Sequence, residues 1–140
     1  MDTSFFTEMN WLAVLVAAVL YFMLGALWYS KALFGNTWIK ATGIDMNKPD
    51  AQKGMGGVMA FTFILVVITC IGLGILVHRL VLESLMSGIK LGLLTGICFT
   101  SVGICINHLY QSKPKILWLI DGGYHIIGSI IAAIVLCMWG

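Results

Sequence analysis

Four long apolar segments dominate the pattern of hydrophobic and polar positions along the chain. A helix that crosses a bilayer needs about 20 mostly apolar residues. Four runs meet this length: Trp11 to Tyr29, Met55 to Val77, Leu85 to Leu109, and Ile116 to Trp139. Polar and charged residues collect between them. The pattern therefore predicts an all-α fold, an integral membrane four-helix bundle that forms a single domain over residues 1–140.

The connection 30–54 is expected to contain a short interfacial helix between helices 1 and 2. Phe34, Trp38 and Ile39 recur there at near-helical spacing among lysines. An amphipathic segment of this kind lies in the membrane interface, with its lysines toward lipid phosphates. Gly43 is expected to end this helix, because glycine readily adopts the left-handed conformation of a helix C-cap.

A second capping signal follows in the same connection. Asn47 stands three residues before Asp50, with Pro49 between them. Asparagine is favoured at the N-cap of a helix and proline in its first turn. Asn47 is therefore expected to cap the second membrane helix.

Small residues recur at four-residue spacing along the third span. Gly88, Gly92 and Gly96 continue a pattern that begins at Ser84 and ends at Thr100. Such a stripe lets two helix backbones approach closely. The stripe is expected to pack against another helix, either in the same chain or in a second copy.

The fourth span contains the most unusual stretch, WLIDGGYH, from Trp118 to His125. Asp121 and His125 share one helix face at i and i+4. Ionisable groups at membrane depth are costly, so they face a partner helix, a cavity or an ion. Gly122 and Gly123 lower helix propensity, which makes more sense if another group presses against that turn.

Polar residues from three spans are expected to meet around Asp121. The connection near Lys113 is so short that the third and fourth spans must form an antiparallel hairpin, and the C-terminal end of the first span lies at the same membrane edge. The candidate polar cavity comprises Trp28, Tyr29, Asn107, His108, Asp121, Tyr124 and His125.

Three functions are compatible with this layer. The leading hypothesis is a binding or transport module whose cavity takes a small ligand or a proton, with Asp121 as the acid and His125 as the titrating group. The alternative is a structural or partner-binding subunit in which these residues only tie helices together. A membrane enzyme acting on a lipophilic substrate is the third, although spacing places no serine or cysteine beside a base. No catalytic residue, metal or cofactor is predicted.

Composition narrows the class of protein further. The chain is 60% hydrophobic and 10% charged, with a mean hydropathy of +1.00, whereas about a quarter of the residues of soluble domains are charged. A net charge of +2 without a dense basic cluster argues against nucleic acid as a partner. The four cysteines lie in apolar segments, outside any CxxC or zinc-ligand spacing, and are expected to pack as small core residues.

The distribution of basic residues predicts the orientation. Six lysines lie in the first and third connections, against Arg79 and Lys90 on the opposite side. Basic connections remain in the cytoplasm, so both termini are expected outside it. A chain this small encloses little volume, which favours a homo-oligomer in the lipid bilayer.

Both ends of the chain resemble a known family. The elements GALWYS (Gly25 to Ser30), FGxxW (Phe34 to Trp38) and WLIDGGYH are similar to those of the bacterial membrane-protein family catalogued as domain of unknown function 1761. The resemblance implies a small four-helix protein of the bacterial inner (cytoplasmic) membrane. It brings no known activity, substrate or catalytic residue.

Overall fold

The computed structural model describes residues 3–50 and 53–140, and all regular structure within them is helical. Its helices are α1 (Phe5–Glu8), α2 (Trp11–Trp28), α3 (Gly35–Thr42), α4 (Met55–Arg79), α5 (Leu85–Leu93), the π-helical segment η1 (Leu94–Ser101), α6 (Val102–Tyr110) and α7 (Lys115–Trp139). Four continuous spans, of which α5, η1 and α6 form one, are long and apolar enough to cross a membrane. The predicted all-α, four-span fold is confirmed.

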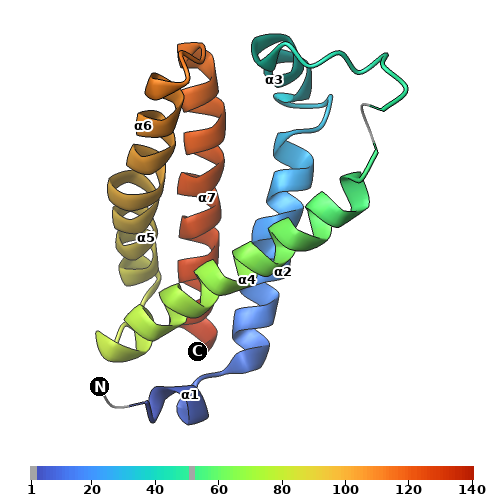
Figure 1. Cartoon of the computed structure of the whole chain (residues 1–140). Coiled ribbons are helices and arrows are strands. Elements are labelled where there is room, and N and C mark those ends of the chain that lie inside the picture. Colours follow the sequence, from blue (N-terminus) through green and yellow to red (C-terminus); the bar gives the residue numbers. More distant parts are fainter. Residues whose placement is uncertain (1–2, 51–52) are drawn as a thin grey trace.

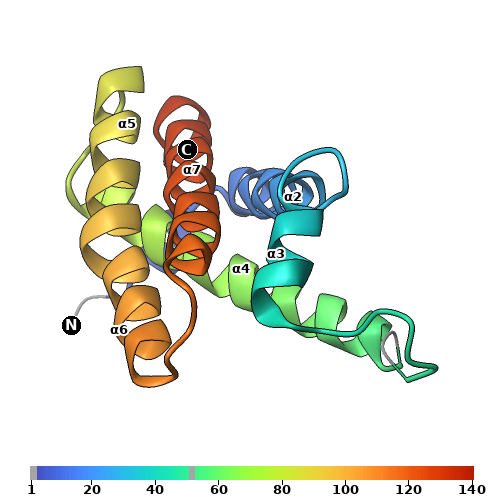
Figure 2. The ribbon, with the colours of Figure 1, turned by 90° about the horizontal axis from the view of Figure 1, so that it is seen from above.

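Helix α7 is the central element of the bundle. It contacts α2 on one side, the α5–η1–α6 span on another, and α4 on a third. Figures 1 and 2 show it between these neighbours, with α3 lying over the end of α2. Because α7 also carries Asp121 and His125, the polar stretch lies where the other spans meet.

The glycine stripe of α5 and η1 faces α7 of the same chain. A Cβ atom added at Gly88 would lie 2.8 Å from the Cα atom of Ile134, and one at Gly96 would lie 2.7 Å from the Cα atom of Ile126. Such approaches are possible only between backbones without side chains at these positions. Since α7 covers the glycine stripe, the stripe is not available for packing against a second copy of the chain.

Small residues also bring α2 close to its neighbours. Ala13, Ala17 and Ala18 are buried, and the ring of Tyr21 is accommodated against Gly128 of α7. Helix α4 adds Cys70 to this core. These contacts form the apolar half of the molecule, toward the end that holds α1.

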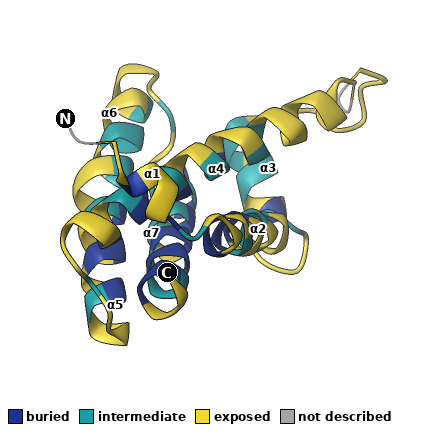
Figure 3. Cartoon of the chain, turned by 90° about the horizontal axis from the view of Figure 1, so that it is seen from below, coloured by how far each residue is buried: buried dark blue, intermediate teal, exposed yellow. Residues whose placement is uncertain are grey.

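Helix α4 crosses the bundle obliquely, and its two halves differ in packing. The C-terminal half contributes buried residues that include Leu73 and Val77. The first turns, residues 55–61, are exposed throughout, and Figure 3 shows this half running away from the other spans. The oblique crossing brings the end of α4 beside the end of α7 and the start of α2.

The π-helical segment η1 interrupts the third span, which was expected to be one uniform helix. Hydrogen bonds in a π-helix join residues i and i+5 instead of i and i+4. Residues that follow η1 are therefore rotated relative to the faces that a continuous α-helix would give them. Helix α6, which follows η1, places His108 against α7.

The two capping predictions had different outcomes. Helix α3 ends at Gly43, whose φ of 72° is left-handed as expected. The prediction that Asn47 caps the second span is wrong: α4 begins at Met55, after Gly54 with φ of 77°. The backbone N–H of Asn47 instead donates to the carboxylate of Asp45 at 2.9 Å, in a local turn.

Candidate functional site

The carboxylate of Asp121 has a partner at each oxygen. The hydroxyl of Tyr29, at the end of α2, donates to Oδ1 at 2.6 Å. The Nε2 atom of His108, on α6, lies 3.4 Å from Oδ2. Because a buried carboxylate without partners is costly, this arrangement accounts for an acid at this depth. It also ties two neighbouring spans to α7.

Aromatic residues surround this carboxylate on the α2 side. The indole N–H of Trp28 donates to the backbone carbonyl of Ile120 at 2.9 Å. The ring of Tyr29 makes edge contacts with Trp38 and Tyr124, at centroid distances of 5.8 and 5.6 Å. Helix α3 thus also contributes to the enclosure of Asp121.

A second polar contact lies one turn deeper, at His125. The Tyr21 hydroxyl is 2.7 Å from Nδ1 of His125, and the hydroxyl of Tyr124 donates to the backbone carbonyl of Tyr21 at 3.3 Å. Tyr21 is only 1% exposed. The contact is therefore a buried link between α2 and α7.

Both glycines of the WLIDGGYH stretch are pressed by side chains, as expected. A Cβ at Gly122 would lie 3.2 Å from the hydroxyl of Ser101, and one at Gly123 would lie 3.1 Å from the Trp28 ring. The Ser101 hydroxyl also donates to the carbonyl of Gly122 at 3.0 Å. Glycine lets two neighbouring spans approach the same turn of α7.

The structure brings six of the seven predicted polar residues to these contacts and leaves Asn107 out. Asn107 is exposed, and its side chain makes no hydrogen bond within residues 3–50 and 53–140. His108, its neighbour in the sequence and also a predicted residue of the cavity, faces Asp121. Two buried polar atoms near this end, Nδ1 of His108 and Nε1 of Trp118, have no hydrogen-bond partner among the described residues.

An apolar groove of about 430 Å³ lies beside Trp28 and Phe34. Its remaining lining residues come from α7: Ile116, Leu119, Ile120, Gly123, Ile126 and Ile127. Trp28 is the one predicted cavity residue in this lining. The groove thus gives Asp121 and His125 no access to a ligand.

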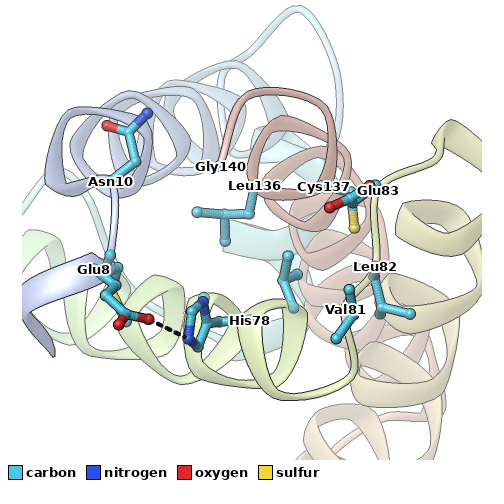
Figure 4. A pocket seen from close by; sticks show the side chains of 12 residues that line it. Glu8, Asn10, His78, Val81, Leu82, Glu83, Leu136, Cys137 and Gly140 are labelled. Carbon is cyan, nitrogen blue, oxygen red and sulfur yellow. Dashed lines mark ion pairs between the residues drawn. The ribbon is translucent and has the colours of Figure 1, made fainter. Parts of the chain in front are cut away.

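A different recess lies at the other end of the bundle and is named here the Glu8 recess. Its volume is about 370 Å³. Figure 4 shows it between Glu8 and His78 on one side and the end of α7 on the other. Its lining consists of Glu8, Met9, Asn10, Gly74, Val77, His78, Val81, Leu82, Glu83, Leu136, Cys137 and Gly140.

Hydrogen bonds and an ion pair hold the walls of the Glu8 recess together. Asn10 caps α2 by accepting from the N–H of Ala13, and its amide donates to the carbonyl of Trp139 at 3.1 Å. His78 Nε2 lies 3.3 Å from the Glu8 carboxylate. The start of α2 is thereby joined to the end of α7, and the end of α1 to the end of α4.

Sequence reasoning missed the Glu8 recess because its polar residues come from three separate segments. Glu8 precedes the first span, His78 ends the second, and Glu83 lies in the following turn. The spacing of these residues predicts no common site. The one available signal was that all three residues lie at the same end of the expected spans. The tilt of α4, which brings His78 to Glu8, could not be predicted from the sequence.

Metal binding finds no support in the described part of the chain. No group of three or more histidine, cysteine, aspartate or glutamate residues there is arranged to hold a metal ion. Asp121 and His108 form a pair without a third such ligand.

Comparison with known proteins identifies the family over most of the chain. Residues 12–137 match the model of a protein family described as "Protein of unknown function (DUF1761)", and the chain belongs to this family. No curated protein and no solved structure matches the chain.

Proposed function

We propose that this multi-pass membrane member of the DUF1761 family is a binding module and that its ligand occupies the Glu8 recess. The observation that carries the proposal is the recess itself. It encloses about 370 Å³ and combines apolar walls with polar groups from several segments. Small-molecule sites are typically clefts of ~300–1,000 Å³ with mostly apolar walls and a few polar groups.

The polar residues around Asp121 have a structural role in this proposal. Both oxygens of the Asp121 carboxylate have partners, and His125 is paired with Tyr21. Interhelical polar contacts of this kind hold membrane helices together, at about 0.6–2 kcal/mol each. The Asp121 cluster therefore stabilises the bundle that carries the recess.

Cys137 allows a direct test of the recess. Its side chain lines the recess with 6% of its surface exposed, whereas Cys70 has no exposed surface and does not line it. Two proteins are prepared in lipid vesicles, one retaining Cys137 alone and the other Cys70 alone. We expect the small neutral reagent methyl methanethiosulfonate to modify Cys137 much faster than Cys70. Equally slow modification of both thiols would contradict an open site.

A recess-filling variant then tests whether the volume matters. Leu82→Trp places a large side chain in the lining, so modification of Cys137 should slow strongly. Leu85→Trp changes a nearby exposed residue that is not part of the lining, so it should leave the rate unchanged. A Leu82→Trp protein that reacts as fast as its parent would argue that the reagent does not reach Cys137 through the recess.

The first turns of α4 favour a second candidate function, a partner-binding subunit. Residues 55–61 are exposed. A Cβ atom added at Gly56 or Gly57 would have no neighbouring atom of the described chain within 4 Å. Paired glycines permit close approach of another membrane helix. In a cysteine-free protein, Gly57→Cys should form a disulfide between two copies under oxidation if these turns join protomers. Gly103→Cys, at an open glycine of α6, is the matched control and should not.

A further inference from the structure

The charge balance of the Glu8 recess is negative. Its lining contains the carboxylates of Glu8 and Glu83 and the imidazole of His78, and among the described residues of the lining there is no lysine or arginine. The two carboxylates outnumber the one group that can carry a positive charge. A cation is therefore favoured over an anion at this end of the bundle.

Helix ends add to this negative potential. The last turns of α4 and α7 both line the recess, through Val77 and His78 and through Leu136 and Cys137. Each helix C-terminus carries a partial negative charge from its unpaired carbonyl groups. The Asn10 amide satisfies the carbonyl of Trp139, but it brings no formal charge.

Arg79, next to His78 in the sequence, contacts an aromatic ring outside the lining. The guanidinium carbon of Arg79 lies 5.1 Å from the centre of the Phe5 ring, in the geometry of a cation–π contact. Arg79 is not among the residues that line the recess. The imidazole of His78, 3.3 Å from the Glu8 carboxylate, is therefore the one lining group among the described residues that can carry a positive charge against two carboxylates.

Apolar walls determine which kind of cation fits. Met9, Val77, Leu82 and Leu136 face the same volume as the carboxylates. A metal ion would leave most of about 370 Å³ unfilled, and no cluster of metal ligands exists among the described residues. An ammonium group with an apolar body matches both parts of the lining.

Resting on the binding function proposed above, we infer that the Glu8 recess takes an organic ammonium ion, with its charged group between Glu8 and Glu83 and its apolar part against Leu82 and Leu136. The ammonium group can belong to a soluble amine or to a lipid headgroup. Both sources present the same chemistry to the recess.

Thiol reagents that differ in charge test this inference on the protein that keeps Cys137 alone. The reagents are methanethiosulfonates carrying a methyl, a trimethylammonium-ethyl or a sulfonatoethyl group. We expect the cationic reagent to react about tenfold or more faster than the anionic one, relative to their rates with a free thiol, because a negatively lined cleft concentrates cations. Glu8→Gln combined with Glu83→Gln should remove most of this preference. Asp45→Asn with Asp50→Asn removes the same charge outside the lining and should preserve it.

The outcomes separate the two proposals. Fast reaction with the neutral reagent but equal rates for cation and anion would overturn the ammonium inference and leave the binding module intact. Slow reaction with the neutral reagent, as slow as at Cys70, would overturn the binding module itself.

Protection experiments identify the source of the ammonium group. In vesicles of phosphatidylglycerol, tetraethylammonium chloride should slow the neutral reagent at Cys137 more than sodium chloride of equal ionic strength does. Protection in phosphatidylethanolamine vesicles without added amine would assign the ammonium group to a lipid headgroup. Absence of protection in both arms would contradict the inference.

Discussion

The polar residues of this protein fall into two sets with different surroundings. Asp121 and His125 are engaged by Tyr29, His108 and Tyr21 within the bundle. Glu8 and its partner His78 are largely solvent-accessible and line an open recess. The intramembrane acid, although it is the most unusual residue of the sequence, is thus less available to a ligand than the ion pair at the helix ends.

The Tyr29 hydroxyl should contribute measurably to stability. Tyr29→Phe removes the donor to Asp121 and leaves one carboxylate oxygen without its partner. We expect the free energy of unfolding to fall by about 1–2 kcal/mol, measured by denaturant titration in detergent micelles. Tyr110→Phe, at a residue that is 89% exposed, should leave it unchanged. Equal stability of the two variants would argue against a tie at Asp121.

Whole elements differ in how closely they are held to α7. The α5–η1 segment approaches it backbone to backbone through Gly88, Gly92 and Gly96. The first turns of α4 touch little of the described chain. The third span is therefore the neighbour that packs most closely against α7. Lipid or a partner must cover the N-terminal half of α4.

Gly92 should tolerate no side chain. A Cβ there would collide with the backbone of Ile130, so Gly92→Ala must push α5 away from α7. We expect a loss of about 1–3 kcal/mol of unfolding free energy, with a lower Tm in micelles. Gly103→Ala lies in the same span with open space around it and should be neutral or stabilising. Comparable Tm values for both variants would contradict the packing described here.

The sequence predicted correctly those features whose pattern lies within a single helix. Each membrane helix is a long apolar run, the glycine stripe repeats within one span, and Gly43 terminates α3 locally. Helix depth alone placed the end of the first span near Asp121, but it did not single out Tyr29 as the partner of the carboxylate.

Features that depend on how helices pack against each other could not be predicted from the sequence. Nothing in the residues of η1 distinguishes a π-helix from an α-helix, so both Asn107 and His108 were expected in the polar cavity, whereas only His108 reaches Asp121. The Glu8 recess depends on the oblique crossing of α4, which hydropathy does not encode. A local asparagine signal at Asn47 was outweighed by a turn at Asp45.

On the scale of the whole molecule, the fold places the Glu8 recess and the lysine-rich connections at opposite ends. The recess is formed where the start of α2 meets the ends of α4 and α7, whereas Lys113 and Lys115 flank the start of α7. Basic connections favour the cytoplasm, so we propose that the recess opens on the other side of the membrane.

Orientation can be measured with a reporter fused after Gly140. Alkaline phosphatase, which is active only outside the cytoplasm, should be active in this position, and a cytoplasm-dependent fluorescent protein should be dark. Fusions placed within the connection after α3 provide the reverse control. A bright C-terminal fluorescent fusion would invert the proposed orientation.

The most direct test of the account compares ammonium binding at the two polar sites. Tetraethylammonium binding is measured by isothermal titration for Asp121→Asn and for Glu8→Gln with Glu83→Gln, both in phosphatidylglycerol nanodiscs. We expect Asp121→Asn to lower Tm and retain binding, whereas the double glutamate variant, which loses the exposed Glu8–His78 ion pair, should change Tm only slightly and lose at least tenfold in affinity, or about 1.4 kcal/mol. Loss of binding in Asp121→Asn at unchanged Tm, with binding intact in the double variant, would contradict it.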